Sequence, residues 1–122
     1  MKEEDLSLPI ETWLRGQGYH VSAEVRDCDL VAIDERSDEM IIVELKTRMS
    51  LDLVVQGVHR LESADSVYLA IPLNGSRGRL RNARGVHATL RRLGLGLIYV
   101  RFLRGGTRVE PVLHPGDYTP RR

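Results

Sequence analysis

Two acidic residues and a lysine have the types and spacing that suit metal-assisted phosphate chemistry. Asp29 directly precedes the apolar stretch 30–33, and Glu44 directly follows the apolar stretch 41–43. In an antiparallel hairpin that turns at 36–37, facing residues have numbers that sum to 73, so Asp29 lies directly opposite Glu44. Their Cβ atoms would then be about 4.5–5.5 Å apart on one face of the sheet.

Two carboxylates this close repel each other unless a proton or a cation lies between them. Hard oxygen ligands of this kind suit Mg²⁺, with Mn²⁺ as a substitute. Lys46 stands two residues after Glu44 and points to the same face, where its flexible ammonium can reach a water on the metal or a phosphate. The alternative is an internal salt-bridge cluster of Asp29, Glu44 and Lys46 that binds no metal.

The apolar periodicity predicts the elements that must position these groups. Ser7 is expected to cap the first helix, with Pro9 in its first turn, and Ser50 to cap the second, whose apolar face comprises Leu51, Val54, Val55, Val58 and Leu61. Pro72 is expected to end the fourth strand. The predicted helices cover 8–17, 51–63 and 79–93, and the predicted strands cover 19–26, 29–34, 40–47, 66–71, 97–103 and 107–113.

The order α-β-β-β-α-β-α-β-β predicts an α/β (α+β) fold with one mixed sheet and helices on both of its faces. The strands at 29–34 and 40–47 are apolar on both faces, which is typical of central strands. A length of 122 residues fits one domain, expected at 1–113, followed by an extended C-terminal tail at 114–122.

Composition narrows the class of protein further. Apolar residues make up 42% of the chain and charged residues 29%, as in ordinary soluble globular proteins. No apolar run approaches the ~20 residues of a membrane helix, and the acidic N-terminus has no secretory apolar region. A single cysteine cannot form an internal disulfide, which suits a cytoplasmic protein, and four scattered histidines form no zinc pattern.

Charge is unevenly distributed along the chain. Residues 1–65 carry 15 acids and 7 bases, a net charge of −8, whereas residues 66–109 carry nine arginines and no acid. This polarity favours a cation site beside a surface that faces a polyanion, and the alternative is a dipolar surface without a ligand. The arginines expected to contact nucleic-acid phosphates are Arg48, Arg77, Arg79, Arg81 and Arg84.

The order of these motifs resembles the PD-(D/E)XK phosphodiesterase superfamily, which includes restriction endonucleases and Holliday-junction resolvases. Asp29, then Glu44-Leu45-Lys46 at the end of the next strand, follow a leading helix as in that superfamily. The predicted α-β-β-β-α-β run matches its core, so the resemblance implies a restriction-endonuclease-like fold with an added C-terminal helix and β-hairpin. Over about residues 8–120 the chain is similar to an uncharacterised bacterial family of PD-(D/E)XK-type phosphodiesterases, through the strings at 24–25, 28–32, 43–46, 56–58 and 67–72.

The resemblance implies roles for the motif residues. Asp29 and Glu44 would be the metal carboxylates, with the Leu45 carbonyl as a further ligand. Lys46 would orient or polarise the attacking water. The implied activity is a Mg²⁺-dependent phosphodiesterase, a nuclease for which DNA is the favoured substrate.

The resemblance also implies further site residues. Gln56 would lie on the following helix near the site. The superfamily often adds a glutamate from the first helix, and Glu11 fits that role, while Glu24 in the first strand competes for it. Related nucleases often pair up, so a homodimer is an open expectation. The rival interpretations are a nuclease-like module that binds nucleic acid or protein without cleaving, and a purely structural subunit.

Overall fold

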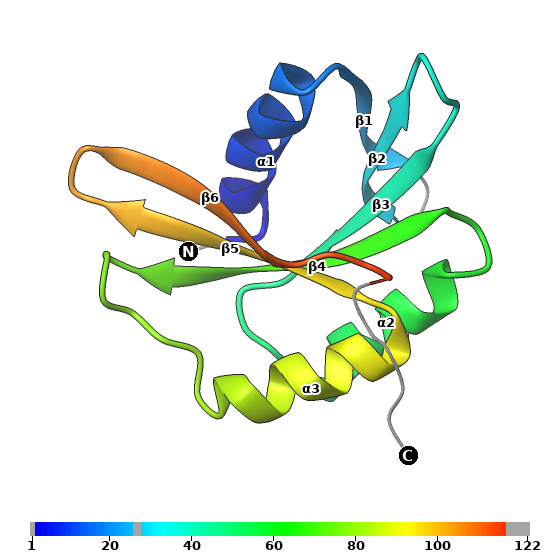
Figure 1. Cartoon of the computed structure of the whole chain (residues 1–122). Helices are drawn as coiled ribbons and strands as arrows, with labels where there is room; N and C mark the ends of the chain where they lie inside the picture. The colour runs from blue at the N-terminus through cyan, green and yellow to red at the C-terminus, as the bar shows by residue number, and fades with distance from the viewer. Residues whose placement is uncertain (1, 26–27, 117–122) are drawn as a thin grey trace.

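The computed structural model describes residues 2–25 and 28–116, and this part of the chain contains three helices and six strands (Figure 1). All six strands join one sheet in the order β1-β2-β3-β4-β5-β6, so each strand lies beside its neighbours in the sequence. The elements are α1 (Glu4–Gly16), β1 (Tyr19–Val25), β2 (Cys28–Asp34), β3 (Met40–Leu45), α2 (Leu51–Arg60), β4 (Ser66–Asn74), α3 (Ala83–Leu93), β5 (Gly96–Leu103) and β6 (Gly106–Leu113).

The sheet is mixed. β1, β2 and β3 form an antiparallel meander, β3, β4 and β5 are parallel, and β5 and β6 form an antiparallel hairpin. The two parallel connections pass through α2 and α3, so the carboxyl ends of β3, β4 and β5 lie at the same edge of the sheet. Figure 1 shows the loops that follow β3 and β4 leaving from that edge.

Helices cover both faces of the sheet (Figure 1). Buried Leu6, Ile10 and Leu14 of α1 join one core cluster, on one face. Leu53 of α2 and Leu90 of α3 join a second cluster, on the other face. The predicted mixed α/β architecture with helices on both faces is confirmed.

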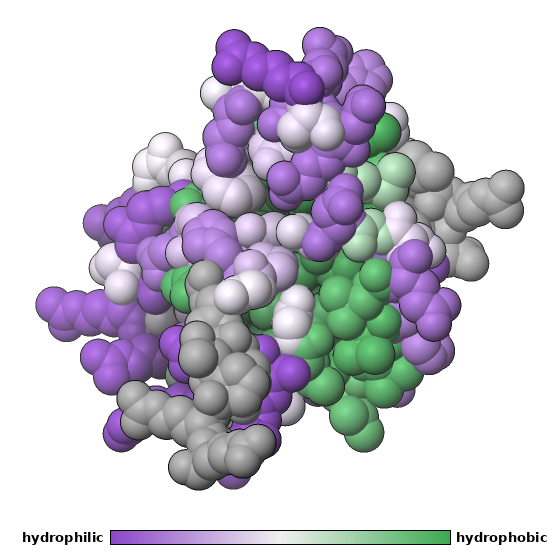
Figure 2. Space-filling model, turned by 45° about the vertical axis from the view of Figure 1, so that its right-hand side comes forward, coloured by the Kyte–Doolittle hydropathy of each residue, from purple (hydrophilic) through white to green (hydrophobic). Residues whose placement is uncertain are grey.

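The sheet-facing side of α2 differs from the prediction. Leu53 and Gly57 are the buried residues of this helix, whereas Leu51 and Val55 are 77% and 44% exposed. The helix lies so close to the sheet that a Cβ at Gly57 would be 2.7 Å from Leu69 Cδ2, which explains why a glycine stands on the inner side. Figure 2 shows a hydrophobic area on the side where Figure 1 draws α2 and the end of α3.

The first helix begins earlier than its sequence signals predicted. α1 starts at Glu4 and contains Pro9 in its interior, and no side chain caps its N-terminus, so the expected cap at Ser7 is wrong. Ser7 instead donates from Oγ to Glu11 Oε2 at 2.7 Å. The buried Leu6 explains the extension, because it continues the core-facing side of the helix by one turn.

Two boundaries after β3 also differ. β4 continues past Pro72 to Asn74, because its pairing with β3 ends at Ala70 and the proline has a ladder neighbour on one side only. α3 begins at Ala83 rather than 79, because Asn82 adopts a left-handed conformation (φ 55°) that interrupts a helix running through it.

Ser50 caps α2 as predicted, accepting from the Leu53 N–H at 3.2 Å. Of the predicted tail, 117–122 lies outside the described residues.

Candidate metal site and basic hollows

The pairing of β2 with β3 follows the register expected from the sequence. Leu30 pairs with Val43 and Val31 with Ile42, so the facing numbers sum to 73. The pairing ends at Leu30 and Val43, and the same register carried one step further would place Asp29 opposite Glu44. The Asp29 N–H lies 3.5 Å from Glu44 Oε2, which brings the glutamate carboxylate against the start of β2.

Glu44 is a buried acid paired with an arginine that the sequence did not point to. It is 1% exposed and lies on the face of the sheet that α2 covers, next to Ile42. Arg60, in the last turn of α2, donates from Nε to Glu44 Oε1 at 2.9 Å. One carboxylate oxygen is therefore held by α2, and the other is directed to Asp29.

Asp29 is half-buried and has a perturbed acidity. Its Oδ2 accepts from the Leu45 N–H at 2.7 Å, which ties the side chain to the end of β3. The pKa of Asp29 is raised to about 6, first by burial and then by the carboxylates of Glu44 and Glu3, while the Leu45 hydrogen bond lowers it. Asp29 therefore takes up its proton at a higher pH than an ordinary aspartate, and a bound cation would favour its ionised form.

The backbone adds a third oxygen to this pair. The Lys46 N–H donates to the Ala70 carbonyl at 3.1 Å, on the β4 side of β3. Because C=O and N–H point in opposite directions across a trans peptide, the Leu45 carbonyl is directed to the β2 side, where Asp29 lies. The expected ligands Asp29, Glu44 and Leu45 therefore meet at one end of β2 and β3.

This donor set fits a hard divalent cation. Across residues 2–25 and 28–116, no group of three or more His, Cys, Asp or Glu side chains is arranged to hold a metal ion. Mg²⁺, however, is commonly held by one or two carboxylates and completes its shell with water and substrate phosphate oxygens. Two neighbouring carboxylates with a backbone carbonyl satisfy that requirement.

Lys46 lies at the same end of the sheet, but its ion pair is with Glu3 and not with the Asp29 and Glu44 of the salt-bridge alternative. Its Nζ is 3.5 Å from Glu3 Oε2, at the start of α1. Glu3 also raises the pKa of Asp29, so its carboxylate is within electrostatic range of both residues. Glu3, the residue just before α1, is therefore an acid close to this site. Only the true start of α1, which the sequence signals misplaced, could have pointed to it.

The two other glutamates expected at the site have different outcomes. The carboxylate of Glu11 is occupied within α1, where it accepts from Ser7 and lies 3.3 Å from Arg15 Nη2. The structure does not bring Glu11 to Asp29 or Glu44. Glu24 falls within β1, and its side chain is outside the part of the chain that the structure describes.

Lys46 also lines a surface hollow of about 460 Å³ together with Arg48 and Gln56. Asp52 and His59, on the outer side of α2, line the same hollow and were not singled out in the sequence. Gln56 therefore lines the same hollow as Lys46, and its expected place near the metal carboxylates stays a prediction. Asp29 and Glu44 are not among the lining residues.

Residues from the arginine-rich segment 66–109 line a second hollow. Arg79 and Arg84 line a space of about 410 Å³ with His87, Tyr99 and Arg101. The ring nitrogen Nε2 of His87 lies 2.8 Å from the Tyr99 hydroxyl, at the wall of the hollow. Arg77 and Arg81, also expected to bind phosphate, are exposed and do not line this hollow.

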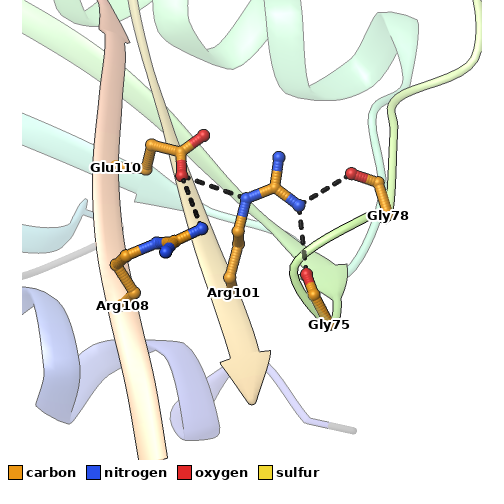
Figure 3. A network of polar contacts seen from close by, with 5 residues as sticks. All are labelled: Gly75, Gly78, Arg101, Arg108 and Glu110. Atoms are coloured by element: carbon orange, nitrogen blue, oxygen red, sulfur yellow. Dashed lines mark hydrogen bonds and ion pairs between the residues drawn. The ribbon is translucent and has the colours of Figure 1, made fainter.

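Arg101 anchors the loop that carries these arginines (Figure 3). Its Nη1 donates to the carbonyls of Gly75 and Gly78 at 3.1 and 2.8 Å, and its Nε donates to Glu110 Oε2 at 3.0 Å. Arg108 makes a second ion pair with Glu110 at 3.4 Å. Because the Arg101 side chain is only 12% exposed, its role in the loop is structural.

Comparisons with family models, with curated proteins and with solved structures found no match to this chain. Within the described residues, no helix has the length and apolarity needed to cross a membrane.

Proposed function

We propose that the protein is a divalent-metal-dependent phosphodiesterase that hydrolyses nucleic-acid phosphodiester bonds, with DNA as the favoured substrate. The observation that carries this proposal is the approach of the Glu44 carboxylate to Asp29, where it helps to raise the pKa of Asp29 and where a bound cation would relieve the repulsion. The order of the first six elements and Lys46 just after β3 support a PD-(D/E)XK nuclease-like core.

Each residue of the proposed site would have its own role. Asp29, Glu44 and the Leu45 carbonyl would hold Mg²⁺ or Mn²⁺, which when bound supplies Lewis-acid stabilisation of phosphoryl oxygens and a more acidic water. Arg60 holds Oε1 of Glu44 and so keeps Oε2 facing Asp29. The Lys46 ammonium would leave Glu3 to contact the attacking water or a phosphate oxygen, and Gln56, which lines the same hollow, would lie beside the substrate.

Cleavage assays test this function directly. Purified protein should cleave labelled single- and double-stranded DNA with 5 mM Mn²⁺ or Mg²⁺ and not with EDTA, and Lys46→Met should lower the rate by at least 100-fold. Lys2→Met is the matched control, because the chain contains only these two lysines and Lys2 is exposed. Equal rates for the wild type and Lys46→Met would remove the proposed catalytic role, and no cleavage of DNA or RNA would remove the function.

The Glu44–Arg60 ion pair favours one second candidate, a nuclease-like module that binds nucleic acid without cleaving it. An arginine already neutralises the most buried carboxylate, as it would in a site that needs no metal. Calorimetric titration with Mn²⁺ separates the two functions. Binding that disappears in Asp29→Asn supports the phosphodiesterase, whereas absence of metal binding with DNA binding retained supports the module.

A homodimer and a cytoplasmic location stay predictions. The first comes from the resemblance to paired nucleases, and the second from the single cysteine. Sedimentation equilibrium at several concentrations would measure the mass of the species in solution. A monomer at every concentration would contradict the dimer.

A further inference from the structure

Three surface hollows share lining residues along one edge of the sheet. The hollow at Lys46 and a third hollow of about 400 Å³ both include Thr47. The third hollow and the one at Arg84 both include Leu73 and Arg79. All three lie where β3, β4 and β5 end, beside the loops that lead to α2 and α3 (Figure 1).

The lining of these hollows has a strong excess of positive charge. The lysine and arginines among the described lining residues are Lys46, Arg48, Arg79, Arg84 and Arg101, and the one acid is Asp52. Arg101 is bound to Glu110, and Lys46 pairs with Glu3. The remaining cations, Arg48, Arg79 and Arg84, come from different segments and together follow the whole row of strand ends.

The spacing suits a chain of negative charges more than a single anion. Neighbouring strands lie about 4.8 Å apart, so the row from β3 to β5 spans roughly 10 Å before side chains are added. Tyr99 is the one tyrosine, tryptophan or phenylalanine in the lining and is only 5% exposed, so no large aromatic ring is offered for base stacking, and the other rings of the lining are the imidazoles of His59 and His87. Binding would therefore depend on phosphates and not on base identity.

We propose that the three hollows form one continuous groove, the strand-end groove, that binds consecutive phosphates of a single nucleic-acid strand. The proposal deepens the phosphodiesterase function above and rests on it. Lys46 stands at the reacting end of the groove, and Arg79 and Arg84 hold phosphates further along the strand. Arg101 is a positioning residue, because it fixes the loop that carries Arg79 through Gly75 and Gly78.

A charge-matched pair of double variants tests the groove. Arg79→Ala/Arg84→Ala removes two groove arginines, and Arg36→Ala/Arg91→Ala removes two exposed arginines that line none of the three hollows. The probe is a fluorescent 12-nucleotide oligothymidylate, measured by anisotropy in EDTA across a salt titration. EDTA prevents cleavage, so the measurement reports binding alone.

The groove variant should bind at least 10-fold more weakly and lower the slope of log K against log salt by about 1.4, since each single-strand phosphate contact contributes about 0.7. The control pair should change affinity by less than 3-fold. Three results would overturn the groove. The first is an equal loss of affinity in both variants, and the second is no binding by the wild type. The third is a duplex that binds more strongly than the single strand and whose affinity Arg79→Ala/Arg84→Ala does not change. Binding as expected without cleavage under Mn²⁺ would retain the groove and reject the phosphodiesterase.

Discussion

At the scale of single residues, the proton on Asp29 connects stability to pH. Below about pH 4 the carboxyl is protonated in both folded and unfolded chains. Between about pH 4 and pH 6 the folded state holds the proton more tightly, because burial raises the pKa of Asp29 to about 6. The free energy of unfolding contributed by this group therefore falls as pH rises through that window.

Asp29→Asn should abolish this pH dependence. With a discount for the partial exposure of the side chain, the wild type should lose about 1–2 kcal/mol relative to the variant between pH 4 and pH 7. Urea unfolding at intervals of half a pH unit measures the difference. Asp34→Asn, at the other end of β2, is the control and should keep the wild-type profile. Parallel profiles for the wild type and Asp29→Asn would contradict the prediction.

The Arg60–Glu44 pair predicts strong coupling between two residues. Arg60→Met leaves a carboxylate that is 1% exposed without its guanidinium, and should lower the free energy of unfolding by about 2 kcal/mol. The same substitution in a Glu44→Gln background should cost less than half as much. Urea unfolding of all four proteins gives the coupling energy, and additive effects would show that the pair contributes nothing.

At the scale of elements, the packing of α2 on the sheet depends on a glycine. Ala is usually the better helix former by about 1 kcal/mol, but a Cβ at Gly57 would meet Leu69, which is fully buried. Gly57→Ala should therefore destabilise the protein by about 1–2 kcal/mol. Gly85→Ala in α3, where the Cβ meets the exposed Asn82 side chain, should be neutral or stabilising. Thermal unfolding compares the two, and equal stabilisation by both would contradict this close packing.

The sequence predicted some of these elements and contacts better than others. The register of β2 and β3 follows from one turn and the period of two, both of which are local, so the approach of Glu44 to Asp29 was predictable. Glu3 and Arg60 reach the site from the ends of two helices, and their positions depend on how those helices pack on the sheet. Apolar periodicity also misplaced the inner side of α2, because it counts Leu51 and cannot recognise that Gly57 allows a close approach.

At the scale of the whole molecule, the proposed cation should stabilise the fold. Mn²⁺ at ten times its dissociation constant contributes about 1.4 kcal/mol to stability, which for a domain of this size raises the melting temperature by roughly 5 °C. Asp29→Asn and Glu44→Gln should lose this shift. Glu11→Gln should retain it, because the Glu11 carboxylate is paired within α1. Thermal scans with and without Mn²⁺ measure the shift, and an unchanged shift in Asp29→Asn would reject the site.

The architecture as a whole was predictable because element order and apolar faces fix it. Strands at 29–34 and 40–47 without a polar face require cover on both sides, and the structure provides α1 on one face and α2 with α3 on the other. The grouping of Arg79 with Lys46 along the strand ends was not predictable. It depends on the parallel alignment of β3, β4 and β5 and on the loop conformation that Arg101 fixes.

The strand order has a consequence for how the chain reaches this structure. Because β1 to β6 lie in the sheet in the order in which they are synthesised, no strand needs a partner from a distant part of the sequence. The two parallel pairings still join residues 25 and 28 positions apart, as Ile41 with Ser66 and Tyr68 with Gly96, so they close longer loops than the hairpins do. Each new strand can add to an edge that already exists, so the sheet can assemble progressively as the polypeptide leaves the ribosome.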